Sequence, residues 1–247
     1  MKRQILAAVL TMGLLAFSGQ IVAGPQLTID NGSFDFGLVP QNSKVSHVYW
    51  LHSTGDDTLK ITQVVPGCGC TKAPLERDRL APGDSTRLEV IFDTRNYSGL
   101  ITKAPHIETN EGQNAQVVQF TCKVSLNPDS THPILIRPHK LDFIQIDGKP
   151  RKEFQFTISN VSDKEIDLTT VDYPEQYATI EIPKSIKAGE TAQAKVKFNV
   201  DAADKEIEKS LTLQLNDGEK SRFTVPLKRT IIKPSVDTTA TPAAGRK

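Results

Sequence analysis

The feature that most constrains the fold of this chain is an internal repeat. Residues 80–92 (LAPGDSTRLEVIF) recur as residues 186–198 (IKAGETAQAKVKF), and residues 107–112 (IETNEG) recur as residues 213–218 (LQLNDG). Both pairs are offset by 106 residues, and matches further upstream are offset by 106 or 107. A nearly constant offset indicates two copies of one unit. Because each copy spans about a hundred residues, each unit is predicted to be a domain rather than one turn of a repeat array.

Each copy has the pattern of a β-sheet protein. Apolar or partly apolar side chains alternate with polar ones along several short runs, such as residues 45–51, 118–124, 154–158 and 211–215. A period of two residues places these side chains on one face of a strand. Turn sequences rich in Gly, Asn and Asp separate the runs. About seven short strands per copy, separated by such turns, predict an all-β chain with two tandem immunoglobulin-like β-sandwich domains.

The composition along the chain divides it into five parts. We expect the first immunoglobulin-like domain at residues 25–126 and the second at residues 134–233. Residues 127–133 (NPDSTHP) are polar and contain two prolines, which predicts a short, stiff linker between close neighbours. Residues 234–247 are small, polar and without pattern, which predicts a disordered tail. The remaining part, residues 1–23, has the composition of a targeting segment.

A secretory signal peptide is the prediction for residues 1–23. Lys2 and Arg3 form a short positive region, residues 5–17 are apolar apart from a threonine and a glycine, and small residues follow. Cleavage is expected after Ala23 or the next residue. A membrane anchor is the alternative, but the apolar run is shorter than the ~20 residues that span a bilayer. We therefore expect a soluble periplasmic or secreted protein without a membrane span once the signal is removed.

Charge and missing motifs exclude several functions. The chain has 30 basic and 29 acidic side chains, and this balance argues against nucleic-acid binding driven by bulk charge. Both methionines lie within residues 1–23, so a methionine-rich copper carrier is excluded. The sequence has no G-x-S-x-G elbow, phosphate-binding glycine loop, H-E-x-x-H motif or dinucleotide fingerprint. We therefore predict a protein that is not an enzyme and has no cofactor.

A set of ordered motifs in the first copy resembles a known family. They are Phe34-x-Phe36-Gly37, Val45-x-His47-x-Tyr49-x-Leu51, Leu59-x-Ile61, Cys68-Gly69-Cys70-Thr71, Pro82-Gly83-Asp84-Ser85 and Phe92-Asp93-Thr94. Together they resemble the bacterial domain-of-unknown-function family 1573, a relative of the Hydin-type and major-sperm-protein-type immunoglobulin-like domains. The resemblance covers roughly residues 30–125, and the second copy lacks the Cys-Gly-Cys motif and is read as a diverged relative. It implies an exported immunoglobulin-like module without an established activity.

The three cysteines are Cys68, Cys70 and Cys122, and all lie in the first copy. One interpretation is structural: one cysteine of the pair bonds Cys122, or the pair is inert and ties a loop to the sandwich. A second is a reversible redox pair, because a bridge between residues i and i+2 is expected to be strained and reducible. A third is a soft-metal site for Cu(I) or Zn with a nearby histidine. Cys122 shares a strand face with apolar residues, which favours a buried thiol.

The only tryptophan is the best candidate for a partner contact. If Tyr49 and Leu51 face the core, then Val48 and Trp50 face outward on the same strand. Exposed aromatic residues often anchor partners, although packing against the other domain or a loop would explain Trp50 equally well. His47 alternates with Tyr49 and is expected to be an interior histidine that is hydrogen-bonded.

Taken together, these observations favour an exported, non-enzymatic protein-binding or structural module. Its partner is expected to be another exported or cell-envelope protein that docks on a sheet face or an edge strand. One alternative is a thiol-redox or soft-metal module that uses Cys68 and Cys70. Another is a pilus-type periplasmic chaperone, which also has two immunoglobulin-like domains.

Overall fold

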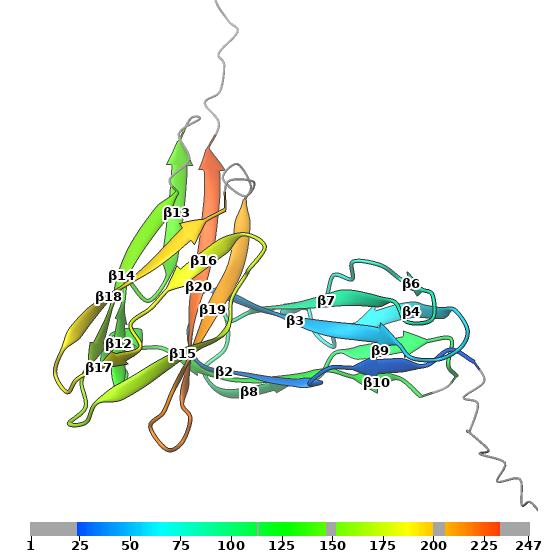
Figure 1. Ribbon diagram of the computed structural model, residues 1–247, viewed down its shortest axis with the longest axis horizontal. Coiled ribbons are helices and arrows are strands. Elements are labelled where there is room, and N and C mark those ends of the chain that lie inside the picture. The colour runs from blue at the N-terminus through cyan, green and yellow to red at the C-terminus, as the bar shows by residue number, and fades with distance from the viewer. Residues whose placement is uncertain (1–23, 113, 147–151, 200–205, 233–247) are drawn as a thin grey trace, which may run out of the picture.

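The computed structural model describes residues 24–112, 114–146, 152–199 and 206–232. The predicted signal peptide and tail lie outside these residues. The regular secondary structure of the described residues is nearly all β-strand, and the one helical element there is the short 3₁₀ turn η1 (Pro128–Ser130). In the described residues, no helix is long and apolar enough to cross a membrane. Figure 1 shows two β-sandwiches whose strands run in clearly different directions.

The first sandwich has two facing layers. One sheet has the order β1-β3-β7-β5. Its strands are β1 (Leu27–Ile29), β3 (Lys44–Ser53), β7 (Ser85–Asp93) and β5 (Thr71–Lys72). The other layer is formed by two sheet segments with the orders β10-β9-β4-β6 and β2-β11-β8. Their strands are β2 (Ser33–Pro40), β4 (Leu59–Val65), β6 (Arg79–Leu80), β8 (Gly99–Lys103), β9 (His106–Thr109), β10 (Gln116–Val117) and β11 (Gln119–Ser125).

The second sandwich repeats this arrangement. One sheet has the order β12-β14-β18-β16. Its strands are β12 (Ile134–Arg137), β14 (Glu153–Asn160), β18 (Thr191–Phe198) and β16 (Ala178–Glu181). The other contains β13 (Leu141–Ile146), β15 (Ile166–Asp172), β17 (Ser185–Ile186), β19 (Ile207–Leu215) and β20 (Arg222–Ile232). Strand β13 runs parallel to β20, as β2 runs parallel to β11 in the first sandwich. The predicted fold class, two tandem β-sandwiches, is confirmed.

Alternating burial explains why these segments form strands. In β7, every second residue from Thr86 to Phe92 is buried, and the residues between them are half-buried. Phe92 is fully buried and its ring lies 5.2 Å from the ring of Phe120 on β11. Fully burying a side chain of this size stabilises the folded state by about 1.5–3 kcal/mol. Each sandwich has its own hydrophobic core of this kind.

Strands β2 and β20 join the two sandwiches, because Leu38 pairs in parallel with Phe223 and one sheet thereby continues from β8 through β2 and β20 to β17. Thr224 on β20 donates a hydrogen bond from its hydroxyl to the carbonyl of Phe36, at 2.6 Å. Arg222 donates to the carbonyl of Asp35 at 3.0 Å. Gly37 follows Asp35 and Phe36 with φ +64°, and a Cβ there would lie 2.1 Å from the carbonyl oxygen of Arg222. Only glycine combines this backbone conformation with this approach.

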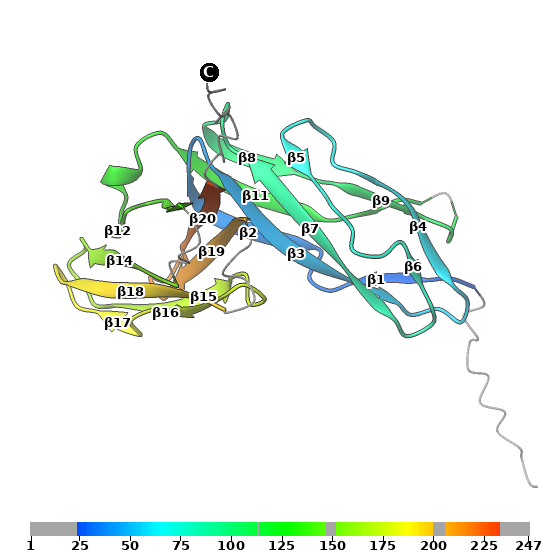
Figure 2. The ribbon, with the colours of Figure 1, turned by 90° about the horizontal axis from the view of Figure 1, so that it is seen from above.

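Strand β3 forms a second junction with β19. The amide of Ser46 donates to the hydroxyl of Ser210 at 3.0 Å, and that hydroxyl donates to the carbonyl of Ser46 at 3.0 Å. Both serines are buried, so breaking this reciprocal pair would leave polar groups without partners. Ion pairs between Lys44 and Glu208 and between Lys209 and Glu89 flank the serines. Figure 2 shows β2 and β3 of the first sandwich next to β19 and β20 of the second. The contacts at both junctions hold the sandwiches in one relative orientation.

Candidate functional site

A cleft of about 530 Å³ opens where the two sandwiches meet. Its wall on the first sandwich includes Val48, Trp50 and Leu75, and its wall on the second includes Tyr173 and Tyr177. Val48 and Trp50 face away from the core of the first sandwich, as predicted from the alternation in β3. The structure therefore places both predicted partner-contact residues on one wall of an interdomain cleft.

Trp50 is held in a defined position while 45% of its surface stays exposed. The guanidinium of Arg87, on the neighbouring strand β7, lies 5.8 Å from the centre of the indole ring. Glu76 fixes that guanidinium with two hydrogen bonds of 2.8 and 2.9 Å, and these bonds lower the pKa of the Glu76 carboxyl. A large aromatic side chain that is exposed but positioned loses little conformational entropy when a partner covers it.

The opposite wall is the loop that follows β15. Tyr177 closes this loop by donating its amide to the carbonyl of Pro174 at 2.9 Å. The ammonium of Lys209 lies 5.6 Å from the centre of the Tyr177 ring and is also paired with Glu89 of the first sandwich. The loop therefore presents aromatic and proline side chains toward Trp50. This position of the loop was not predicted from the sequence, although two tyrosines and a proline within five residues are a usable signal for an exposed aromatic loop.

His47 and Asp172 connect the floor of the cleft across the domain boundary. Nδ1 of His47 lies 2.6 Å from a carboxylate oxygen of Asp172. The imidazole stacks on Phe34 with ring centres 3.7 Å apart. The histidine is hydrogen-bonded as expected, but its partner belongs to the second sandwich. It lies at the edge of the core, where its side chain is half-buried.

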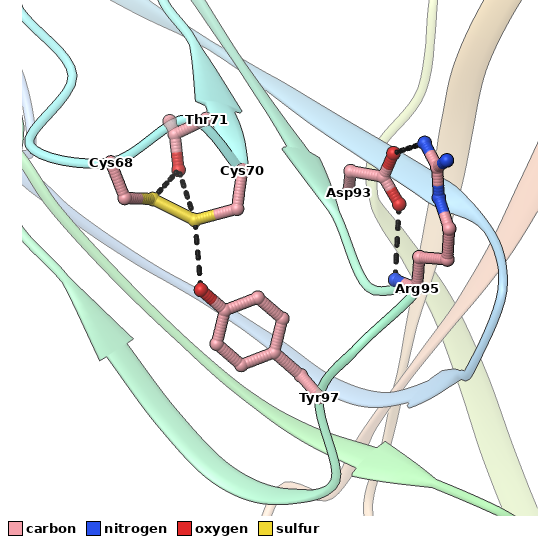
Figure 3. The surroundings of a disulfide bond; sticks show 6 residues. All are labelled: Cys68, Cys70, Thr71, Asp93, Arg95 and Tyr97. Carbon is pink, nitrogen blue, oxygen red and sulfur yellow. Dashed lines mark hydrogen bonds and ion pairs between the residues drawn. A yellow bond between two sulfur atoms is a disulfide. The ribbon is translucent and has the colours of Figure 1, made fainter.

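Cys68 and Cys70 are joined to each other by a disulfide in the loop between β4 and β5. Figure 3 shows the Tyr97 hydroxyl directed at the bridge, where it donates to Sγ of Cys70 at 3.1 Å. The Thr71 hydroxyl lies 3.4 Å from Sγ of Cys68 and 3.7 Å from Sγ of Cys70. Because the two sulfurs are bonded to each other, neither is a thiolate that could bind a metal in this state.

Cys122 does not bond either cysteine of the motif. It is a free thiol in β11, buried among the apolar side chains of the first core. This corrects the expectation that Cys122 could be the disulfide partner of the pair. Its strand holds it on the core face beside Phe120 and Val124, whereas residues 68 and 70 pair with each other in their own loop.

Burial makes Cys122 an unreactive thiol. Desolvation raises its pKa to about 12, and the negative charge of Asp35 adds to the shift. We expect iodoacetamide to leave Cys122 unmodified at pH 8 in the folded protein and to modify it once the chain is unfolded, because the thiolate is the reactive form. Mass spectrometry after alkylation measures the modification of Cys122, and rapid labelling of the native protein would contradict the buried position.

The raised pKa of Cys122 also affects stability. The free energy of unfolding is expected to fall as the pH rises from about 9 to about 12, because the thiol of the unfolded chain ionises over this range while the buried thiol stays protonated.

The described residues contain no cluster of three or more His, Cys, Asp or Glu side chains that could hold a metal ion. A second cavity of about 280 Å³ lies near Lys44, Asp93, Arg95 and Lys140. Its charged groups are largely paired, as in the Arg95–Asp93 ion pair at 2.6 Å. The interdomain cleft is larger and has the exposed aromatic surface.

The model of a protein family described as a protein of unknown function (DUF1573) matches residues 27–124 and again residues 134–231. The chain belongs to the DUF1573 family. The resemblance drawn from the motifs of the first copy is thus confirmed, and the second copy matches the same family although it lacks the Cys-Gly-Cys motif. The cleft lies between two DUF1573 domains of one chain.

Solved structures resemble this DUF1573 protein only distantly. A protein of unknown function from Porphyromonas gingivalis W83 has 16% identity and a TM-score of 0.35, with 82% of this chain and 98% of that chain covered. The ASH/PapD-like domain 7 of human CEP192 has 9% identity and a TM-score of 0.35, with coverages of 49% and 99%. The YadV chaperone has 9% identity and a TM-score of 0.29, with coverages of 82% and 98%. A search of curated proteins gives no match.

Proposed function

We propose that this DUF1573 protein is an exported, non-enzymatic module that binds another exported or cell-envelope protein in the cleft between its two domains. The observation that carries the proposal is the exposed but fixed Trp50, which faces the Tyr173–Tyr177 loop across the cleft. Tryptophan and tyrosine are enriched among the few residues that contribute most of the binding energy in protein interfaces. The export part of the proposal rests on the sequence of residues 1–23.

Most of the charged side chains that line the cleft are paired with one another. Glu76 is held by Arg87, Glu89 by Lys209, and Asp172 by His47. The same pairs fix the walls of the cleft, which lowers the cost of ordering side chains when a partner binds.

Edge-strand addition is the competing mode of partner binding. Strand β8 ends its sheet, and its Leu100 is 79% exposed. An added strand would cover this edge and leave the cleft open. Positions 50 and 100 therefore report different modes of binding on the same domain.

Site-specific photo-crosslinking in the producing cells tests the proposal. A photoreactive phenylalanine analogue replaces Trp50 in one variant and Leu100 in a matched control, since both positions carry a large, exposed apolar side chain. We expect one specific covalent adduct with an envelope or exported protein from position 50 and none from position 100. An adduct from position 100 alone would indicate edge-strand addition, and no specific adduct from position 50 would overturn the proposal.

A further inference from the structure

The Cys68–Cys70 bridge adds little to the stability of the sandwich. It closes a loop between residues only two apart in sequence, and the chain-entropy benefit of a disulfide falls as the closed loop becomes shorter. The second DUF1573 domain forms the same sheets without cysteines. A stabilising role therefore does not account for the bridge, and its chemical surroundings become the relevant evidence.

The hydrogen-bond donors near the bridge are placed unequally about the two sulfurs. The Tyr97 hydroxyl donates a hydrogen bond to Sγ of Cys70 at 3.1 Å. The Thr71 hydroxyl, at 3.4 and 3.7 Å from the two sulfurs, distinguishes them only weakly. A donor aimed at one sulfur stabilises the negative charge that appears there when the bridge opens.

Tyr97 is itself held in place by its neighbours. Its backbone carbonyl accepts a hydrogen bond from the Gln41 side chain at 2.9 Å. Its ring packs against Phe92, with ring centres 5.2 Å apart. The Lys103 ammonium lies 5.0 Å from the ring centre, so a positive charge stands close to the donor. The hydroxyl is therefore positioned before the bridge reacts.

The bridge is also accessible. Both cysteines are partly exposed, and Gly67 before them and Gly69 between them are exposed. A Cβ built at Gly67 or at Gly69 would meet no atom within 4 Å, so no neighbouring group crowds the outer side of the loop there. Gly67 has φ +81°, a conformation that few other residues adopt without strain. An incoming thiolate can therefore reach the bridge from the outer side of the loop.

We propose that Cys68–Cys70 is a redox-active disulfide that exchanges with a dithiol of another protein, with Cys68 as the sulfur attacked and Cys70 as the leaving group. A partner thiolate attacks Sγ of Cys68, the Cys68–Cys70 bond breaks, and its electron pair goes to Sγ of Cys70. Tyr97 donates its hydrogen bond to this thiolate, which then takes a proton from water. A stabilised thiolate leaves faster in such an exchange.

The second half of the exchange releases the partner in oxidised form. The second thiolate of the partner attacks the partner's own sulfur in the mixed disulfide. The partner disulfide forms, and Cys68 leaves as a thiolate that is then protonated. Two electrons thus pass from the partner dithiol to the bridge, and two thiols remain on this chain. Tyr97 acts as a catalytic residue in this scheme, because its hydroxyl contacts the leaving sulfur of Cys70, and the activity is separate from binding in the cleft.

The location of the mixed disulfide tests the direction of attack. The full chain carrying Cys122→Ala, which removes the third thiol, is exposed briefly to glutathione, quenched with acid and alkylated. We expect mass spectrometry to find glutathione on Cys68 in about tenfold excess over Cys70, because the leaving-group preference acts on the rate of each attack. Glutathione mainly on Cys70, or a bridge that glutathione does not open in the folded protein, would overturn the proposal.

Tyr97→Phe in the same background tests the role of the hydroxyl. This variant keeps the ring against Phe92 and removes only the donor. We expect glutathione to open the bridge about tenfold more slowly, and the equilibrium with a reference dithiol to shift by about tenfold toward the disulfide, equivalent to about 30 mV. Thermal unfolding controls for structural damage. A folded variant with an unchanged opening rate and an unchanged equilibrium would overturn the assignment of Tyr97.

Discussion

Replacing Gly37 with alanine should lower the free energy of unfolding by about 3 kcal/mol. Part of the loss comes from the backbone, since a non-glycine residue in the left-handed region costs about 1–2 kcal/mol. The rest comes from the contact between domains, because the new Cβ would lie 2.1 Å from the carbonyl oxygen of Arg222. Forcing atoms into such a packed contact costs about 1–3 kcal/mol. Chemical denaturation of the variant and the parent chain measures the difference.

Gly83 provides the matched control for this prediction. It has φ +84°, but a Cβ there would meet nothing within 4 Å. Gly83→Ala should therefore lose only the backbone part, about 1–2 kcal/mol. Equal losses of the free energy of unfolding in the two variants would contradict close packing of Gly37 against Arg222 in solution.

Replacing Trp50 with alanine should weaken partner binding by about 30-fold. Truncating a central tryptophan in a protein interface costs about 2 kcal/mol or more, and each 1.4 kcal/mol corresponds to about tenfold in the dissociation constant. Arg87 lies over the indole ring, so the variant also removes the group on which that guanidinium rests. The affinity is measured with the protein that crosslinks to position 50, by titration with the purified chain.

Leu100→Ala is the control for the loss of exposed apolar surface. Leu100 is 79% exposed on β8 and does not line the cleft. Its truncation should change the affinity by less than about twofold, as for most residues outside the centre of an interface. Equal effects of the two variants would contradict binding in the cleft.

Much of the fold was predictable because the necessary signals are local. Alternation along residues 85–93 reports which side chains of β7 are buried. The constant offset between the repeats predicts that the second sandwich has the same strands in the same order. The parallel pairing of β2 with β11, and of β13 with β20, follows the same duplication. The exposed position of Trp50 also follows from the period of two residues in β3.

The cleft was not predictable in the same way because it depends on contacts between distant residues. Ser46 and Ser210 are 164 residues apart, and neither has a sequence signature that announces a partner. Asp172 and the two tyrosines that follow it differ from the first repeat at the corresponding loop, which marks a difference without showing what the loop faces. Likewise, Tyr97 lies 27 residues from Cys70, so the donor to the disulfide was invisible from the Cys-Gly-Cys motif alone.

Partner binding in a preformed cleft requires the two sandwiches to form one rigid frame around it. Pulsed electron–electron double resonance measures the distance between spin labels at positions 100 and 144 directly, in the full chain with Cys122→Ala. Leu100 and Ile144 are both exposed, at 79% and 66%, and they lie on different sandwiches. We predict a single narrow distance distribution that broadens when Gly37→Ala is added. A broad distribution in the chain that retains Gly37 would contradict a preformed cleft.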